Sequence, residues 1–147
     1  MAGLAGSREI AVADASVCGL RDAATVRCVY PDGTLTTYLL SDRIVGLVAA
    51  FYMLCARTES LDVFCMGAGG KPAPSLVPEL GGARLLAAGL GQACALVADG
   101  TIACSQGTEG STFPDRCEGT DVVDLQASQL SLCALHADGT IRCGTSR

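Results

Sequence analysis

The 147-residue sequence contains no tryptophan, a single histidine (His136) and a single lysine (Lys71), and only 4% of its residues are aromatic. The other basic residues are arginines that stand singly, so no basic stripe is available to bind the phosphates of a nucleic acid. A Ser-His-Asp or Cys-His catalytic set would need His136, and nothing in the sequence places a nucleophile beside it. These shortages predict a protein that is not an enzyme and has no nucleic-acid partner.

Long apolar runs are also scarce, and the longest candidate, residues 44–56, is too short to cross a bilayer as a helix. We expect a buried strand there and no membrane span within this chain. Residues 1–8 lack a basic segment followed by an apolar run, so no signal peptide is visible. The glycines at 67–70 have neither a following Lys-Ser/Thr pair nor a helical pattern, so we expect a loop rather than a phosphate cradle, and no cofactor.

Glycine is abundant, with 18 copies, and half of the residues are hydrophobic. Many short apolar runs are separated by Gly, Asp, Pro and Ser, which is typical of strands and turns rather than helices. The length suits one domain with a real core, and the net charge of −5 is spread thinly along the chain. The composition therefore predicts a single all-β domain.

Nine cysteines are present, and eight of them fall into four pairs with the same internal spacing. The pairs are Cys18/Cys28, Cys55/Cys65, Cys94/Cys104 and Cys133/Cys143. They could be disulfides, metal ligands or redox centres, but the spacing is unusual for zinc and no Cys-x-x-Cys motif occurs. We favour structural disulfides and expect no metal site. Paired cysteines at this density indicate an oxidising compartment, extracellular or within the secretory pathway.

The third and fourth pairs enclose almost the same letters, CALVADGTIAC at 94–104 and CALHADGTIRC at 133–143. Each reads as a hairpin closed by a three-residue turn, which places Cys94 opposite Cys104 and puts Gly100 in the left-handed position. A two-residue turn would send the cysteines to opposite faces of the sheet. The turn residues are then Asp99, Gly100, Asp138 and Gly139. The earlier copies have Ala24 and Leu61 instead of glycine, so we expect another turn geometry there.

The ninth cysteine, Cys117, lies in a polar stretch between the third and fourth pairs and is predicted to be an unpaired thiol. It could link two chains, and the alternative is a solvent-exposed spare thiol. Its neighbours carry charges of both signs, which indicates no clear shift of its acidity.

The first cysteines follow one another at intervals of 37, 39 and 39 residues, and a period-2 apolar pair precedes each of them. A period near 40 with several strands per copy is typical of β-propeller blades. We therefore predict a propeller-like arc or small propeller of four blades, each with a disulfide-clamped hairpin. The repeats span about 8–42, 43–82, 83–120 and 121–147. Residues 35–40 are expected to form an outer strand, and residues 1–9 could supply the outer strand of the last blade.

The inner strand followed by Cys-Ala-Leu-x-x-Asp-Gly-Thr-Ile-x-Cys resembles the repeat of the regulator of chromosome condensation superfamily. It is most similar to the cysteine-paired repeat in the ectodomains of plant Crinkly-type receptor-like kinases. The resemblance covers about residues 8–144. It departs from the family in lacking the tryptophan after the second cysteine, and in keeping the glycine before the first cysteine only as Gly89. Family propellers typically have seven blades, whereas this chain has four repeats and no kinase domain.

This resemblance implies a non-enzymatic extracellular recognition module, similar to part of a receptor ectodomain, that binds a protein or peptide through inter-blade loops. We expect the loops at 72–82 and 106–121 to bind, because rigid blades leave sequence freedom there. The alternative is a secreted propeller that acts alone as an inhibitor or lectin-like binder. A third possibility is a truncated product without independent function. An open blade edge, or Cys117, could also mediate self-association.

Overall fold

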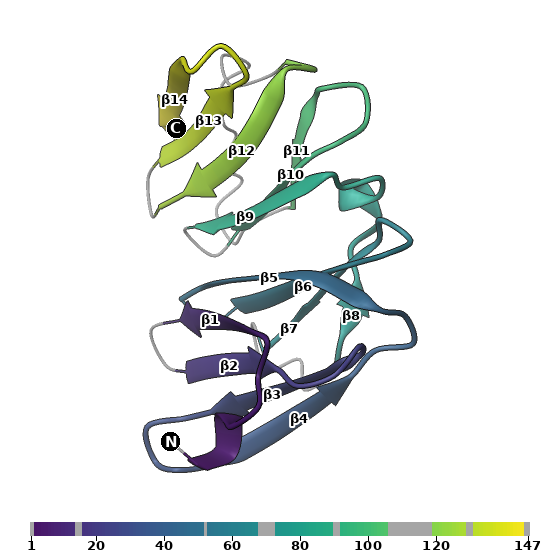
Figure 1. Ribbon diagram of the computed structural model, residues 1–147, viewed down its shortest axis with the longest axis vertical. Helices are drawn as coiled ribbons and strands as arrows, with labels where there is room; N and C mark the ends of the chain where they lie inside the picture. Colours follow the sequence, from purple (N-terminus) through teal and green to yellow (C-terminus); the bar gives the residue numbers. More distant parts are fainter. Residues whose placement is uncertain are drawn as a thin grey trace.

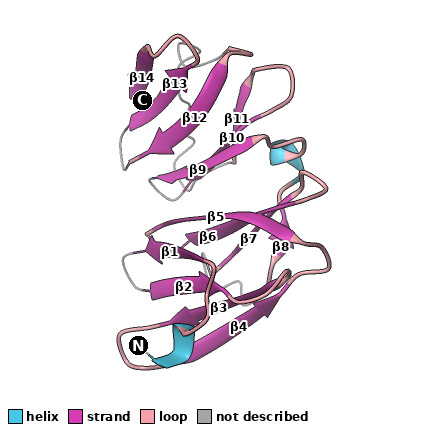
Figure 2. Cartoon of the chain, in the orientation of Figure 1, coloured by secondary structure: helices cyan, strands magenta, loops and turns pink. Residues whose placement is uncertain are grey.

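The computed structural model describes residues 2–13, 16–51, 53–67, 73–89, 92–105, 119–128 and 131–145, which fold into four antiparallel sheets. Figure 1 shows the sheets following one another along the long axis, with the two termini at opposite ends. Strands and connecting turns dominate, as the colouring of Figure 2 shows. No helix in the described part of the chain is long and apolar enough to cross a membrane. The predicted all-β arc of four blades is confirmed.

The first two blades have four strands each, paired in chain order. Those of blade 1 are β1 (Glu9–Ala13), β2 (Ser16–Leu20), β3 (Thr25–Val29) and β4 (Leu35–Leu39). Those of blade 2 are β5 (Ile44–Ala50), β6 (Met53–Thr58), β7 (Val63–Met66) and β8 (Ser75–Leu76). Within the described ranges, blades 3 and 4 have three strands each. Those of blade 3 are β9 (Leu85–Gly89), β10 (Gln92–Leu96) and β11 (Ile102–Cys104), and those of blade 4 are β12 (Val122–Ala127), β13 (Ser131–His136) and β14 (Ile141–Thr145).

Each blade contains a hairpin in which two cysteines lie directly opposite each other and are joined by a disulfide. In blade 3 the Cα atoms of the two cysteines are 4.0 Å apart, and the backbone N–H of Val97 donates to the carbonyl of Thr101 to close the three-residue turn. The hairpins therefore have the predicted register, and their sulfur atoms are bonded to each other instead of to a metal. The four disulfides are Cys18–Cys28, Cys55–Cys65, Cys94–Cys104 and Cys133–Cys143.

The four disulfides differ in how deeply they are buried. Cys28 in blade 1 is 1% exposed, whereas its counterpart Cys65 in blade 2 is only half-buried, although its partner Cys55 has no exposed surface. In blade 4, Cys143 is exposed. The second cysteine of each hairpin therefore lies nearer to solvent in some blades than in others, while the pairing stays the same.

The hairpin turns owe their shape to glycine and aspartate. Gly100 and Gly139 have φ angles of 86° and 85°, a region that costs other residues a steric clash. The carboxylate of Asp99 accepts hydrogen bonds from the backbone N–H and the hydroxyl of Thr101, at 2.9 and 2.6 Å. These bonds hold the pKa of Asp99 below its ordinary value, because they favour the charged form. Asp138 makes the same pair of bonds to Thr140 in blade 4.

The second turn differs from our expectation. Leu61 has a φ of 66°, so the prediction that copy two avoids the left-handed region is wrong. Its backbone N–H donates to the carbonyl of Thr58, and the register of the cysteine hairpin is kept although the residue is not glycine. In copy one, Ala24 is outside the left-handed region, and Asp22 accepts the N–H groups of Ala24 and Thr25 instead. The fold thus imposes the left-handed conformation on Leu61, and also on Phe51 after β5, which has a φ of 53°.

The core is made of three layers, one between each pair of neighbouring blades. We call the face of a blade that contacts the following blade its forward face, and the opposite face its backward face. The disulfide always lies on the forward face, as in blade 1, where Cys18, Leu20 and Val26 pack against Leu47 and other residues of blade 2. The layers between blades 2 and 3 and between blades 3 and 4 are built in the same way, from the disulfide-bearing face of one blade and the opposite face of the next. The inner strands β1, β5, β9 and β12 lie side by side in that order (Figure 1).

The N-terminal segment does not complete the last blade. Residues Ala2–Leu4 form the short 3-10 helix η1, which packs against β3 of blade 1. The backbone N–H of Arg8 donates to the carbonyl of Leu20, which fixes the segment to the same blade. The prediction that residues 1–9 supply an outer strand to blade 4 is therefore wrong within this chain, because local packing on blade 1 holds most of the segment.

Candidate binding surfaces

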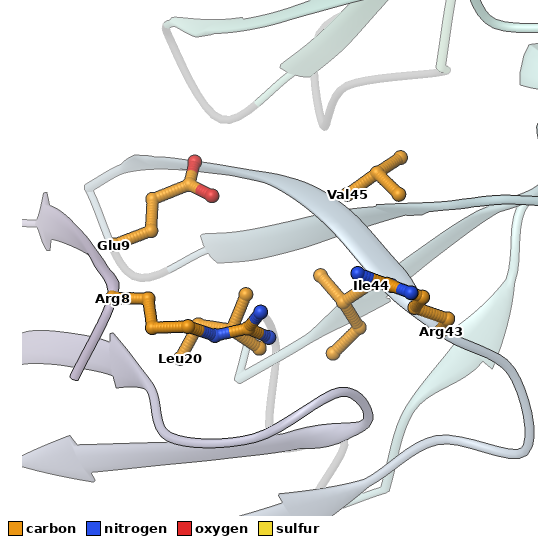
Figure 3. Close-up of a pocket in the computed structure, with 6 residues that line it drawn as sticks. All are labelled: Arg8, Glu9, Leu20, Arg43, Ile44 and Val45. Carbon is orange, nitrogen blue, oxygen red and sulfur yellow. The ribbon is translucent and has the colours of Figure 1, made fainter. Parts of the chain in front are cut away.

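A small pocket lies where the rims of blades 1 and 2 meet, and Figure 3 shows the side chains that line it. Its volume is about 260 Å³. The lining residues are Arg8, Glu9, Leu20, Arg43, Ile44 and Val45. Leu20 and Ile44 are almost fully buried and form an apolar floor, whereas both arginines are exposed at the rim. The pocket therefore combines two positive charges and the negative charge of Glu9 with a buried apolar floor.

Hydrogen bonds to the backbone hold the charged residues of this pocket in place. The guanidinium of Arg8 donates to the carbonyl of Asp22 at 3.0 Å. Glu9 reaches across to blade 2, where its carboxylate accepts the backbone N–H of Leu47 at 2.9 Å. The carbonyl of Arg43 accepts the N–H of Glu59, which fixes the start of β5. Glu9 keeps its negative charge while it joins the two blades, so the two arginines leave the lining with a net charge of one positive unit.

A second hollow, of about 270 Å³, runs along the four inner strands. Small side chains converge there, among them Ala11, Ala49, Ala87 and Ala127. Each inner strand is the edge of its sheet, so its outward backbone groups face this hollow rather than another strand. The hollow occupies the place of the central channel of a propeller.

The two loops that we expected to bind lie only partly within the described residues. Of 106–121, residues 106–118 and with them Cys117 lie outside the described ranges, so the predicted free thiol stays a prediction. Residues 73–82 form β8 and the 3-10 helix η3 (Pro78–Leu80). Leu80 is fully buried between blades 2 and 3. This part of the first loop is therefore built into a blade interface, and Glu79 and Leu76 are among its exposed side chains.

His136 lies at the end of β13, where it is 2% exposed. Its Nδ1 is 3.0 Å from the carboxylate of Asp121, and this hydrogen bond keeps the pKa of Asp121 below its ordinary value. Its Nε2 has no hydrogen-bond partner among the described residues. Among those residues no group of three His, Cys, Asp or Glu side chains is placed to hold a metal ion. The pair fastens β13 to the residues that precede β12, as expected for a histidine that packs within a blade.

No family model matches this sequence, and no curated protein matches it. Solved structures do match. The Crinkly ectodomain of the Arabidopsis thaliana receptor kinase ACR4 is 20% identical with a TM-score of 0.73, over 95% of this chain and 49% of that one. Prp20p of Saccharomyces cerevisiae, the yeast RCC1, is 15% identical with a TM-score of 0.68, over 92% of this chain and 43% of that one. The computationally designed Ika4 protein is 18% identical with a TM-score of 0.67, over 97% of this chain and 94% of that one.

These likenesses show the fold. The chain spans about half the length of the two natural propeller proteins, so it corresponds to part of their blades. Both belong to the group that the repeat pattern indicated, one a Crinkly ectodomain and the other an RCC1 protein. The predicted relation is confirmed at the level of the fold: the chain has the propeller architecture of proteins built from regulator-of-chromosome-condensation-type repeats.

Proposed function

We propose that this chain is a non-enzymatic extracellular recognition module that binds a protein or peptide partner. The observation that carries the proposal is the rim pocket between blades 1 and 2, where Arg8 and Arg43 flank an apolar floor. Disulfides in both blades hold the pocket walls, so little conformational freedom is lost when a ligand binds. The ACR4 neighbour is an ectodomain, and Prp20p has binding properties to Gsp1p and histones, which supports the class of function.

The chemistry of the pocket selects an acidic peptide segment with an apolar side chain. Guanidinium groups bind carboxylates through charge-assisted hydrogen bonds, which are stronger than neutral ones. The apolar floor of Leu20 and Ile44 suits an aliphatic or aromatic neighbour of that carboxylate. The chain carries a net charge of −5, so this arginine pair is a local exception on an acidic protein. Binding by the loop at 106–121 stays a prediction, because residues 106–118 lie outside the described ranges.

The extracellular assignment rests on the four disulfides, which persist in oxidising compartments. Intact-mass measurement of protein from a secretory host should show the mass of four disulfides, and cytosolic expression should give the reduced chain with a lower melting temperature. Eight reactive thiols in folded protein from the secretory host would contradict the assignment.

Peptide binding tests the pocket directly. The probe is a fluorescent N-acetylated peptide of alternating glutamate and leucine, measured by anisotropy, with lysine replacing glutamate in the control peptide. Arg8→Ala and Arg43→Ala should each weaken binding about tenfold, the typical loss of a hydrogen bond to a charged group. Arg84→Ala is the matched control, since Arg84 is an exposed arginine directly before β9, as Arg8 is before β1. Equal affinity of all variants would contradict the proposed site.

A further inference from the structure

The segment before blade 1 is a structural copy of the connector between blades 2 and 3. The 3-10 helices η1 and η3 both end in leucine, five residues before the following inner strand begins. Gly6 and Gly82 then take the left-handed conformation, with φ of 83° and 81°. Arg8 and Arg84 follow, and each donates its backbone N–H to the carbonyl that ends the second strand of its blade, at 2.9 and 2.8 Å. The matched residues are Leu4, Gly6 and Arg8 in one segment and Leu80, Gly82 and Arg84 in the other.

The inner copy shows what such a segment does when a blade precedes it. Leu80 has no exposed surface, because it lies between the forward face of blade 2 and the backward face of blade 3. Its cluster includes Cys55 and Val63 from one blade and Ala93 and Ala95 from the other. The connector is therefore a component of the blade interface and not a surface loop.

None of the described blades covers the N-terminal copy. Leu4 is only half-buried, although it takes the position of Leu80. Ile10 and Val12 of β1 are each 62% exposed, whereas Leu47, the residue of β5 that matches Ile10, is 7% exposed. The backward face of blade 1 thus presents the apolar residues of a blade interface to solvent.

The opposite end of the arc has the complementary surface. The forward face of blade 4 carries Cys133–Cys143 with Leu135 and Ile141 beside it. Ile141 is 67% exposed, whereas Val26 and Val63, which match it in blades 1 and 2, have no exposed surface. In each earlier blade this face is covered by the backward face of the blade that follows. The forward face of blade 4 and the backward face of blade 1 are therefore the same two types of surface that pack together at the three blade interfaces within the chain.

We propose that two copies of this chain join head to tail, with the forward face of blade 4 in each copy packed on the backward face of blade 1 in the other. Leu4 then packs against the Cys133–Cys143 hairpin of the second copy as Leu80 packs against Cys55. Two such contacts related by a two-fold axis close a ring of eight blades, because heterologous contacts form rings when their rotation closes.

Mass measurement by light scattering after size exclusion tests the ring. The experiment uses the full chain with Cys117→Ser, so that association through a thiol is excluded. We expect a dimer, with twice the 14.9 kDa of the single chain. A monomer throughout the micromolar range overturns the proposal, and so does a ladder of larger assemblies, because it would mean that the contact does not close.

Single variants distinguish the head-to-tail contact from other dimers. Ile141→Glu removes one surface and Ile10→Arg the other, and both residues are exposed, so the monomer should still fold, as checked by circular dichroism. Each variant alone should be monomeric, and the two mixed should form a heterodimer through the contact that stays intact. Leu76→Arg, an exposed apolar residue on the edge of blade 2, is the matched control and should remain dimeric. If either variant of Ile10 or Ile141 stays fully dimeric, the head-to-tail contact is wrong.

Discussion

The third and fourth hairpins have nearly the same sequence but lie in different surroundings. Cys94 and Leu96 are buried because blade 4 covers them, whereas their counterparts Cys133 and Leu135 are only half-buried and Ile141 is exposed, because none of the described blades covers that face. Both hairpins keep the same register and the same disulfide. The local sequence thus determines the hairpin, and the neighbouring blade determines whether its apolar face is buried.

The largest expected effect comes from removing a disulfide on either side of this comparison. Each bond closes a loop with a sequence separation of 10 residues. Cys133→Ala/Cys143→Ala should therefore lower the free energy of unfolding by somewhat under ~3 kcal/mol, the loop-entropy cost. Cys94→Ala/Cys104→Ala should lose more, because cavities also form in the layer against blade 4. Urea unfolding in the Ile10→Arg monomer background, where no second copy covers blade 4, measures both, and equal losses would contradict the role of the neighbouring blade.

A second prediction compares the two connector leucines. Leu80→Ala should cost about 3 kcal/mol, within the range for a buried leucine, because it leaves a cavity between blades 2 and 3. Leu4→Ala should cost about 1 kcal/mol in the monomer, because the side chain is only half-buried there. Both substitutions are made in the Ile141→Glu variant, which is expected to be a monomer, and urea unfolding then measures the free energy that each one costs. If Leu4→Ala were as costly as Leu80→Ala, the N-terminal segment would already be fully packed by blade 1.

The turn glycines give a smaller contrast. A Cβ at Gly100 would lie 2.7 Å from the backbone nitrogen of Thr120, whereas nothing lies within 4 Å of one at Gly139. Gly139→Ala should cost about 1 kcal/mol, the penalty of the left-handed conformation alone. Gly100→Ala should cost more, because the overlap with Gly119 and Thr120 is with backbone that cannot rotate away. Thermal unfolding measures the difference, and equal melting temperatures would show that residues 119–120 can move aside.

The smallest effect is on acid stability. Hydrogen bonds from His136 to Asp121 and from Thr140 to Asp138 hold both carboxyl pKa values below the ordinary value of 3.8. The folded state therefore favours the charged carboxylates, which contribute stability above pH 3.8, and this contribution is lost as the pH falls through the lowered pKa values. Asp121→Asn should reduce the loss of melting temperature in acid, and Asp124→Asn serves as the control. An unchanged pH profile for Asp121→Asn would contradict the role of the pair.

The sequence alone was enough to predict the hairpins, their register and their arrangement as blades, because covalent pairing and turn chemistry are local properties. Leu61 was predicted wrongly, since packing of the blade overrides its backbone preference. The burial of Leu80 and the fate of the N-terminal segment depend on contacts between blades, which a single repeat does not encode. The shared pattern of Leu4, Gly6 and Arg8 with Leu80, Gly82 and Arg84 was a visible signal for the connector. The rim pocket had no such signal, because Arg8 and Arg43 meet only after the blades stack.

The stapled hairpins also determine how the chain responds to tension. A force applied to the two termini passes through the blades in series, because the main contacts between blades are those of consecutive blades. Each disulfide joins Cα atoms only 4.0–4.1 Å apart across a separation of 10 residues. Extended chain of that length would span at most about 35 Å, so each disulfide prevents roughly 30 Å of extension when the chain is pulled. The oxidised protein is therefore a short tether, and a reductant would lengthen it in four equal steps.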